Sequence, residues 1–334
     1  MQARQWDPDS RRSASRAAHL SGADACVSPC PLCGAACRRP RFRCSDRLFH
    51  TTDKQFRVVE CGACGALYLE PRPSLEELAA YYPPGYWWSA SNQGGVAGRL
   101  EGLYRRVVLR DQARFLARAA GPPPARILDV GCGSGDLLVA LRRRGYACVG
   151  MDCALTALSA AKAQGLPAVL GDYRASPLGP NLFDLVSMFH FLEHVADPSG
   201  ALAFAHQALR PQGRLVVQAP NAACWQLALL GARWSGLDVP RHLVDFRACD
   251  LERVVERSGF RILRRKHFSL RDNPAALATS LAPGWEPVSR RSRRREGVAR
   301  RLGLDLAYFA LVLAALPFSM VEAAAGRGFH HRER

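Results

Sequence analysis

The stretch Ile127-Leu-Asp-Val-Gly-Cys-Gly-Ser-Gly135 decides the fold of this 334-residue chain. It opens with a short apolar run that is typical of a buried strand and continues into a turn in which every second residue is glycine. Residues 136–144, directly behind the turn, have the apolar spacing of a helix. A glycine turn at a helix N-terminus allows a ligand to approach the backbone closely, with free amide groups beside it. The stretch therefore predicts a strand-turn-helix unit with a ligand site at the turn.

Downstream of this unit, apolar runs of strand length alternate with helical patterns. We expect strands at residues 127–130, 147–151, 168–170, 183–189 and 213–219, helices at 136–144, 155–164 and 199–209, and a sixth strand at 261–268. Strands that alternate with helices indicate right-handed crossovers and a parallel sheet. The predicted class is therefore α/β with a doubly wound, mostly parallel sheet, whose ligand lies at the carboxyl ends of the strands.

Acidic residues at the ends of three predicted strands indicate the kind of ligand. The dinucleotide fingerprint requires glycine where this chain has Asp136, and it would place a diphosphate beside the carboxylate of Asp129, so NAD is disfavoured. Asp129 suits a cationic group instead. Asp152, 23 positions later, can accept two ribose hydroxyls, and Asp172 can accept from an adenine amino group. S-adenosylmethionine has an ammonium, a ribose and an adenine but no phosphate, and it fits this set.

With these motifs, residues 126–268 resemble the class I S-adenosylmethionine-dependent methyltransferases, which have a Rossmann-like fold. The segments 237–243 and 259–260 resemble the branch that methylates small molecules. No Asn-Pro-Pro-Tyr follows the fourth strand, which disfavours N-methylation of bases. The resemblance implies that the methionine end is held by Asp129, Gly131, Gly133 and Gly135, the ribose by Asp152 and the adenine edge by Asp172, with His190 and Phe189 near the methyl group.

Methyl transfer from a sulfonium requires an enzyme to position the nucleophile and to remove its proton. Two histidines, His194 and His242, are the candidate bases, because an imidazole can accept a proton near neutral pH. Glu193 is a candidate helper or metal ligand. Histidines in such loops also serve as structural hydrogen-bonding groups, and that alternative stays open for both.

Four cysteines stand in two paired motifs, Cys30-Pro-Leu-Cys33 and Cys61-Gly-Ala-Cys64. Two residues between thiolates let one tight turn direct both sulfurs at a single ion, so two such turns predict a closed, structural Zn²⁺ site. Strands expected at 56–60 and 66–69 make residues 26–70 a zinc ribbon. Three nearby cysteines, Cys26, Cys37 and Cys44, lack the paired spacing and are the alternative ligands.

The remaining segments flank these two units. Residues 1–25 are expected to be a disordered tail, and 71–98 a connector rich in proline and aromatic residues that packs on a neighbour or lines a pocket. The methyltransferase-like domain is expected at 99–270 and an Arg-rich loop with an apolar helix at 271–334. The stretch 290–321 suits either peripheral contact with a membrane or a cover for the sheet, and Pro317 is expected to interrupt it. The tail after residue 326 is a poor candidate for a last strand.

Composition narrows the class of protein. The chain has 48% hydrophobic residues and a net charge of +17 from 46 Lys+Arg against 29 Asp+Glu, which is globular but strongly basic. No apolar signal segment precedes the first motif, so a cytoplasmic location is expected. We predict methyl transfer to a small-molecule acceptor of sugar, lipid-linked or secondary-metabolite type. The alternatives are an RNA methyltransferase that binds phosphates through its arginines and a non-catalytic cofactor-binding scaffold. The sequence does not indicate an oligomeric state.

Overall fold

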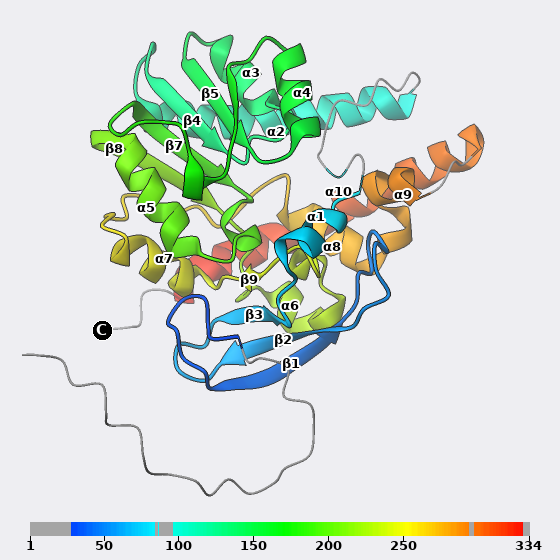
Figure 1. Ribbon diagram of the computed structural model, residues 1–334. Helices are drawn as coiled ribbons and strands as arrows, with labels where there is room; N and C mark the ends of the chain where they lie inside the picture. Colours follow the sequence, from blue (N-terminus) through cyan, green and yellow to red (C-terminus); the bar gives the residue numbers. More distant parts are fainter. Residues whose placement is uncertain (1–27, 84–85, 87–95, 294–296, 330–334) are drawn as a thin grey trace, which may run out of the picture.

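The computed structural model describes residues 28–83, 86, 96–293 and 297–329. Its larger part is a parallel sheet of five strands in the order β6-β5-β4-β7-β8. The strands are β4 (Arg126–Val130), β5 (Ala147–Asp152), β6 (Ala168–Leu170), β7 (Phe183–Phe189) and β8 (Leu209–Gln218). Helices α3 (Asp136–Arg142), α4 (Leu155–Ala163) and α5 (Pro198–Ala208) connect them (Figure 1). The predicted α/β fold with a parallel sheet is confirmed.

Alternating side chains of the central strands divide the core between the two faces of this sheet. Ile127 of β4 and Leu185 of β7 pack with α3 and with α2 (Val96–Ala120). Their neighbours Leu128 and Val186 point to the opposite face, where they share a core with α5. Strands buried on both faces read as continuous apolar runs, which explains why they were visible in the sequence.

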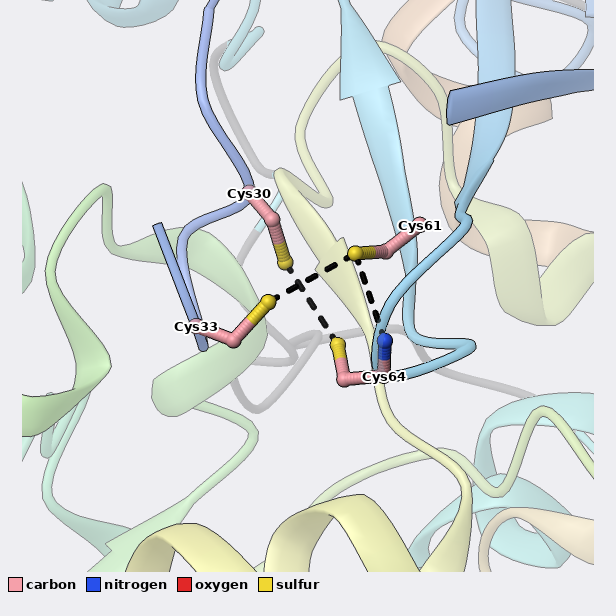
Figure 2. A group of neighbouring side chains, drawn as sticks. All are labelled: Cys30, Cys33, Cys61 and Cys64. Carbon is pink, nitrogen blue, oxygen red and sulfur yellow. Dashed lines mark hydrogen bonds between the residues drawn. The ribbon is translucent and has the colours of Figure 1, made fainter. Parts of the chain in front are cut away.

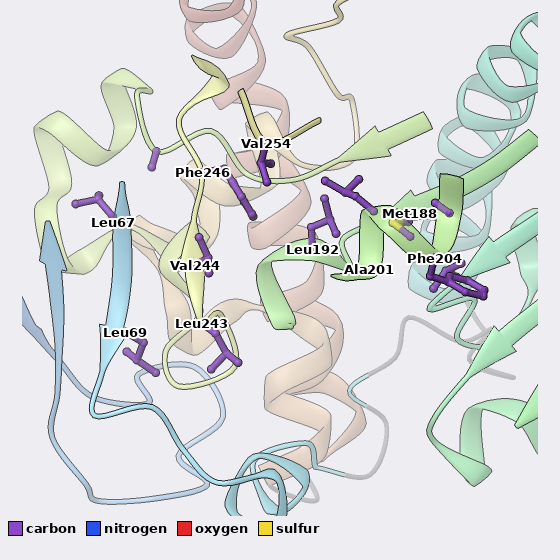
Figure 3. Packing of buried hydrophobic residues seen from close by; sticks show 14 of the residues in the cluster. Leu67, Leu69, Met188, Leu192, Ala201, Phe204, Leu243, Val244, Phe246 and Val254 are labelled. Carbon is purple, nitrogen blue, oxygen red and sulfur yellow. The ribbon is translucent and has the colours of Figure 1, made fainter. Parts of the chain in front are cut away.

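A second, four-stranded sheet has the order β1-β2-β3-β9. Three of its strands come from the N-terminal region: β1 (Arg38–Cys44), β2 (Phe56–Cys61) and β3 (Leu67–Glu70). The fourth, β9 (Val244–Asp245), follows the last strand of the parallel sheet in the sequence and pairs with β3. Figure 3 shows the consequence: Leu67 and Leu69 lie in one hydrophobic cluster with residues of the larger domain, including Val244 and Phe204. The two sheets therefore share a continuous core.

The C-terminal part of the parallel sheet differs from the expectation. Residues 261–268 form no strand, and in the described part of the chain no strand follows β9. The segment lacks an apolar face to bury, since Leu263 is 63% exposed and Arg265 pairs with Glu252 on α7 (Ala248–Arg257). Lys266 is held by Asp111 on α2. The predicted sixth strand was wrong because its basic residues interact with the neighbouring helices and leave no two-residue alternation.

The other helices surround this framework. They are α1 (Leu75–Ala80), α6 (Trp225–Leu230), α8 (Asn273–Leu281), α9 (Pro287–Arg293) and α10 (Val298–Phe329). Helix α1 begins with a capping box between Ser74 and Glu77. Helix α10 continues through Pro317 without a break, contrary to the expected interruption, and packs on α8. Its residues Ala299–Gly326 are long and apolar enough to cross a membrane, as judged by length and composition alone. The expected tail at 1–25 and the residues after 329 lie outside the described part of the chain.

Candidate functional site

The glycine turn lies at the carboxyl end of β4, where the sequence placed it. Gly131, Gly133 and Gly135 all have positive φ angles, of 75°, 54° and 78°. A Cβ atom added at Gly131 would lie 2.8 Å from Cδ2 of Phe191, and one at Gly135 would clash with Cδ1 of Leu166. Both backbone angle and space therefore require glycine here. One cavity runs along this edge of the sheet and is lined by Asp129, Gly131, Gly133, Asp152, Asp172, His190, His194 and His242.

Two carboxylates stand beside the turn. Asp152 accepts hydrogen bonds from the backbone N–H groups of Gly133 and Ala154, both at 2.9 Å, which tie the end of β5 to the turn. Asp129 accepts a hydrogen bond from Ser187 Oγ at 2.6 Å and is 4% exposed. Burial, with the nearby charge of Asp152, raises the pKa of Asp129 to about 7 despite the Ser187 bond. A cationic group placed next to Asp129 would offset that desolvation.

Asp172 occupies a more open position. Its carboxylate caps a short helical turn by accepting from Arg174 N and forms two further hydrogen bonds with the Arg174 guanidinium, at 2.9 and 2.7 Å. These hydrogen bonds with Arg174 lower the pKa of Asp172 against the opposing effect of partial burial. Asp172 is thus an ionised acceptor at the rim of the cavity, one strand away from Asp152.

His190 directly follows β7 and has a φ angle of 51°. Its Nδ1 lies 3.2 Å from Glu193 Oε1, and its Nε2 lies 3.2 Å from Asp272 Oδ1. Burial disfavours the imidazolium, but the two carboxylates outweigh that effect and raise the pKa of His190 to about 9. His190 is therefore a cation at neutral pH, and the three side chains together carry a net charge of −1. Asp272 was not singled out from the sequence, because it lies far from β7 in the chain.

The two candidate bases lie together. The ring centroids of His194 and His242 are 4.6 Å apart, and the rings meet edge to face. Nδ1 of His194 is 3.1 Å from the carbonyl oxygen of Arg241, and Nδ1 of His242 is 2.9 Å from that of Gly236. A carbonyl only accepts, so both Nδ1 atoms carry a proton, and in a neutral His194 ring the lone pair therefore lies on Nε2. Burial, with the charge of His242, lowers the pKa of His194 to about 4.

The connector reaches this pair. The hydroxyl oxygen of Tyr82 lies 2.9 Å from His194 Nδ1, and the Tyr82 ring packs edge to face on Tyr86, with 4.9 Å between the centroids. Tyr82 and Tyr86 also line the cavity with the glycine turn. The connector therefore does both things that the sequence left open: it packs on the larger domain and lines the pocket. Trp87 and Trp88 lie outside the described residues.

A buried arginine joins the N-terminal sheet to the site. Arg241 is 0% exposed and binds Asp46 Oδ1 at 2.9 Å and Asp238 Oδ1 at 2.7 Å. Its guanidinium also donates to the carbonyl of Tyr81, and Asp238 accepts from the Tyr86 hydroxyl at 2.8 Å. We call Asp46, Tyr86, Asp238 and Arg241 the arginine seam. Sequence reasoning missed it, since 195 residues separate Asp46 from Arg241.

Among the described residues, two groups of side chains have the composition of metal sites. Cys30, Cys33, Cys61 and Cys64 point their sulfurs toward one another, with Sγ–Sγ distances of 3.7 Å for Cys30–Cys64 and 3.5 Å for Cys33–Cys61 (Figure 2). A zinc tetrahedron with bonds of about 2.3 Å has edges of about 3.8 Å, so this spacing fits. The second group is Glu193, His194 and His242, whose ligand atoms lie within 4.8 Å of one another.

Comparison with known proteins agrees with this geometry. Residues 103–265 match the family model of the methyltransferase domain. A ubiquinone biosynthesis O-methyltransferase from Pseudomonas aeruginosa is 30% identical over 145 residues, which cover 41% of this chain and 62% of the relative. A protein of the same name from Pectobacterium carotovorum is 29% identical over 211 residues, covering 59% and 84%. The solved S-adenosylmethionine-dependent methyltransferase from Mesorhizobium loti is 24% identical with a TM-score of 0.41, covering 48% of this chain and 86% of that one. The chain thus matches about three fifths of the length of the first of these relatives.

Proposed function

Because residues 103–265 match the family model of the methyltransferase domain, we propose that this chain transfers a methyl group from S-adenosylmethionine to a hydroxyl oxygen of a small-molecule acceptor. S-adenosylmethionine is the methyl donor of this family. The O-methyltransferase names of the relatives support oxygen as the acceptor atom. The observation that carries the proposal is the neutral His194, which lines the same cavity as the glycine turn.

The donor site is proposed at the carboxyl edge of the parallel sheet. Asp129 would hold the ammonium, because its buried carboxyl has a raised pKa and lacks a cationic partner within the described contacts. Gly131, Gly133 and Gly135 would let the methionine end approach the backbone of the turn, because all three have positive φ angles and no side chain. Asp152 and Asp172 would accept from the ribose and the adenine edge. The net negative charge of the His190 cluster would favour a sulfonium nearby.

His194 is proposed as the base. The methyl donor supplies an electrophilic carbon with a sulfide leaving group. His194 Nε2 would remove the hydroxyl proton of the acceptor, so that the oxygen could form its new bond to the methyl carbon as the carbon–sulfur bond breaks. Glu193, which is 1% exposed, would stabilise the resulting imidazolium. His242 would hold the His194 ring by its edge-to-face contact.

The first experiment is calorimetric titration with S-adenosylmethionine and, separately, with NADH. Saturable binding of S-adenosylmethionine alone supports the donor site, whereas binding of neither would contradict both the methyl-transfer proposal and the cofactor-binding scaffold. Formation of S-adenosylhomocysteine is then measured with a panel of phenols and alcohols. His194→Gln should lower the turnover by at least about 100-fold, whereas His206→Gln, an exposed histidine on α5, should not. Equal turnover in the two variants would remove His194 as the base.

Zn²⁺ is proposed at the four-cysteine site, where it would hold the turns before β1 and after β2 together. The site is closed by four thiolates, so its role would be structural. The alternative role for His194 and His242 is to bind a divalent cation together with Glu193. The buried Glu193 Oε2, which has no hydrogen-bond partner, supports this alternative. A chelator that abolishes turnover while the protein stays folded and zinc-loaded would favour that alternative.

A further inference from the structure

Helix α10 turns its apolar side chains outward. Leu313 and Met320 are 69% and 56% exposed, and Leu302, Leu306 and Val321 are also exposed. The exposed positions between 302 and 326 recur every three or four residues and therefore form one face; they are Leu302, Gly303, Leu306, Ala310, Leu313, Ala314, Pro317, Met320, Val321 and Ala324. Every residue of this outward face is uncharged. A surface helix of a globular domain ordinarily has the opposite pattern.

The two carboxylates of α10 and the hydroxyl of Tyr308 point inward and are paired. Asp305 is held by Arg290 of α9, and Glu322 accepts from the backbone N–H of Gln226 at 2.9 Å and from its side-chain amide at 2.8 Å. Between them, the hydroxyl oxygens of Tyr308 and Thr279 lie 2.9 Å apart. Both carboxylates would lose these partners if the helix rotated about its axis. These contacts fix the apolar face on the outside.

We propose that the outward face of α10 binds the surface of an anionic lipid bilayer, with the helix lying parallel to the membrane. Within residues 299–326, an 18-residue window has a mean hydropathy of 1.9, enough for a membrane span as judged by length and composition alone. However, buried residues from Asp305 to Ala323 hold one side of the helix against the protein, chiefly against α8. A helix that packs against its own domain on one side cannot be surrounded by lipid on all sides, as a membrane span is. In-plane insertion of the free face satisfies both observations.

The charge of the protein favours an anionic membrane over a second copy of this chain as the partner that binds the outward face of α10. The chain has a net charge of +17, so two copies repel each other, whereas anionic headgroups attract it. Arg300 is exposed in the first turn of α10, and both acidic residues of the helix are buried. Helix α2, which contacts α10, exposes Arg106, Arg110 and Arg114 at helical spacing.

The test is flotation of the full chain with vesicles of phosphatidylcholine that contain about one third phosphatidylglycerol. The variant is Leu313→Glu with Met320→Glu, which places two charges on the outward face. The control is Leu155→Glu on α4, a leucine that is 67% exposed and thus matches Leu313. We expect the wild type and the control to float, and the double variant to lose at least about 10-fold in vesicle affinity. Pure phosphatidylcholine should bind the wild type more weakly.

Three results would overturn the proposal. The first is a wild type that stays at the bottom of the gradient, or a double variant that floats equally well. The second is a wild type that is dimeric in light scattering and binds no lipid, together with a double variant that is monomeric. A second copy of the chain would then cover the outward face. The third is a membrane-bound wild type that resists alkaline carbonate, which would indicate a span. Lipid binding is measured without methyl transfer, so its outcome is independent of the proposed activity.

Discussion

Replacing Asp46 with alanine tests whether the arginine seam holds the N-terminal sheet on the methyltransferase domain. Asp46 is 2% exposed. Its carboxylate accepts from the backbone N–H groups of Phe49 and Thr51 at 3.0 and 2.9 Å, from Thr51 Oγ1 at 2.6 Å, and from Arg241 Nη2 at 2.9 Å. Alanine removes all of these acceptors at once. Arg241 keeps Asp238, so its charge remains partly compensated.

The expected loss of stability follows from these contacts. Removal of one partner from a buried ion pair costs about 3–5 kcal/mol. Because Asp238 still pairs with Arg241, the stability lost with the ion pair lies near the lower end of this range. The backbone N–H of Phe49 loses its acceptor in a buried position, which adds about 1 kcal/mol. We therefore expect the free energy of unfolding to fall by about 4 kcal/mol.

Urea unfolding followed by far-ultraviolet circular dichroism measures this loss, provided that the slope m is unchanged between variants. Asp53→Ala is the matched control, since Asp53 is an exposed carboxylate on the same loop. Its effect should stay within about 0.5 kcal/mol. If Asp46→Ala lost less than about 1 kcal/mol, the buried pair would contribute little, and the two sheets would be held by their shared hydrophobic core alone.

Four further outcomes are expected. Gly133→Arg should abolish S-adenosylmethionine binding in calorimetry, because a side chain at a φ of 54° would fill the approach to the turn; normal binding would show that the donor site is wrong. Cys30→Ser should release zinc to a chromogenic chelator and lower the melting temperature, with little change in donor affinity. Because the fold raises the pKa of His190 to about 9, the protonated His190 contributes stability that is fully present below pH 6.5 and is lost as the pH rises through 9. The unfolding free energy of His190→Gln should therefore fall less steeply over that range than that of the wild type. The pKa of Asp46 is lowered, because Arg241 outweighs the effect of burial. The stability that the Asp46 carboxylate contributes is therefore present above pH 3.8 and is lost as the pH falls below it. In Asp46→Asn, the unfolding free energy should depend less steeply on pH in that acidic range than in the wild type.

The parallel sheet was predictable because its central strands, β4, β5 and β7, are largely buried on both faces. Runs such as the one in β7 are apolar at nearly every position, and the glycine turn marks where β4 ends. Strand β1 gave no such signal, since its sequence RRPRFRC is mostly exposed and it is a strand only through its pairing with β2. Strand β9 has two residues and exists through its contact with β3. Both depend on a partner, so a local pattern could not reveal them.

The same limit applies to the site. Strand order brings Asp129, Asp152 and His190 to one edge of the sheet, and the sequence predicted that meeting from the ends of the strands. Arg241 lies within the segment 237–243, yet its partner Asp46 lies in the loop between β1 and β2. An ion pair across 195 residues leaves no periodicity in either segment.

The protonation of the two histidines in the loop after β7 shows why the chemistry requires the tertiary structure. His190 and His194 are four residues apart and are the same kind of side chain. Asp272 and Glu193 raise the pKa of His190 to about 9 against the effect of burial, whereas burial, together with His242, lowers the pKa of His194 to about 4. At neutral pH one is a cation that binds carboxylates, and the other is a neutral imidazole with a free Nε2. The neighbours that separate them, Asp272 and His242, come from distant segments, so only the fold determines which histidine can accept a proton.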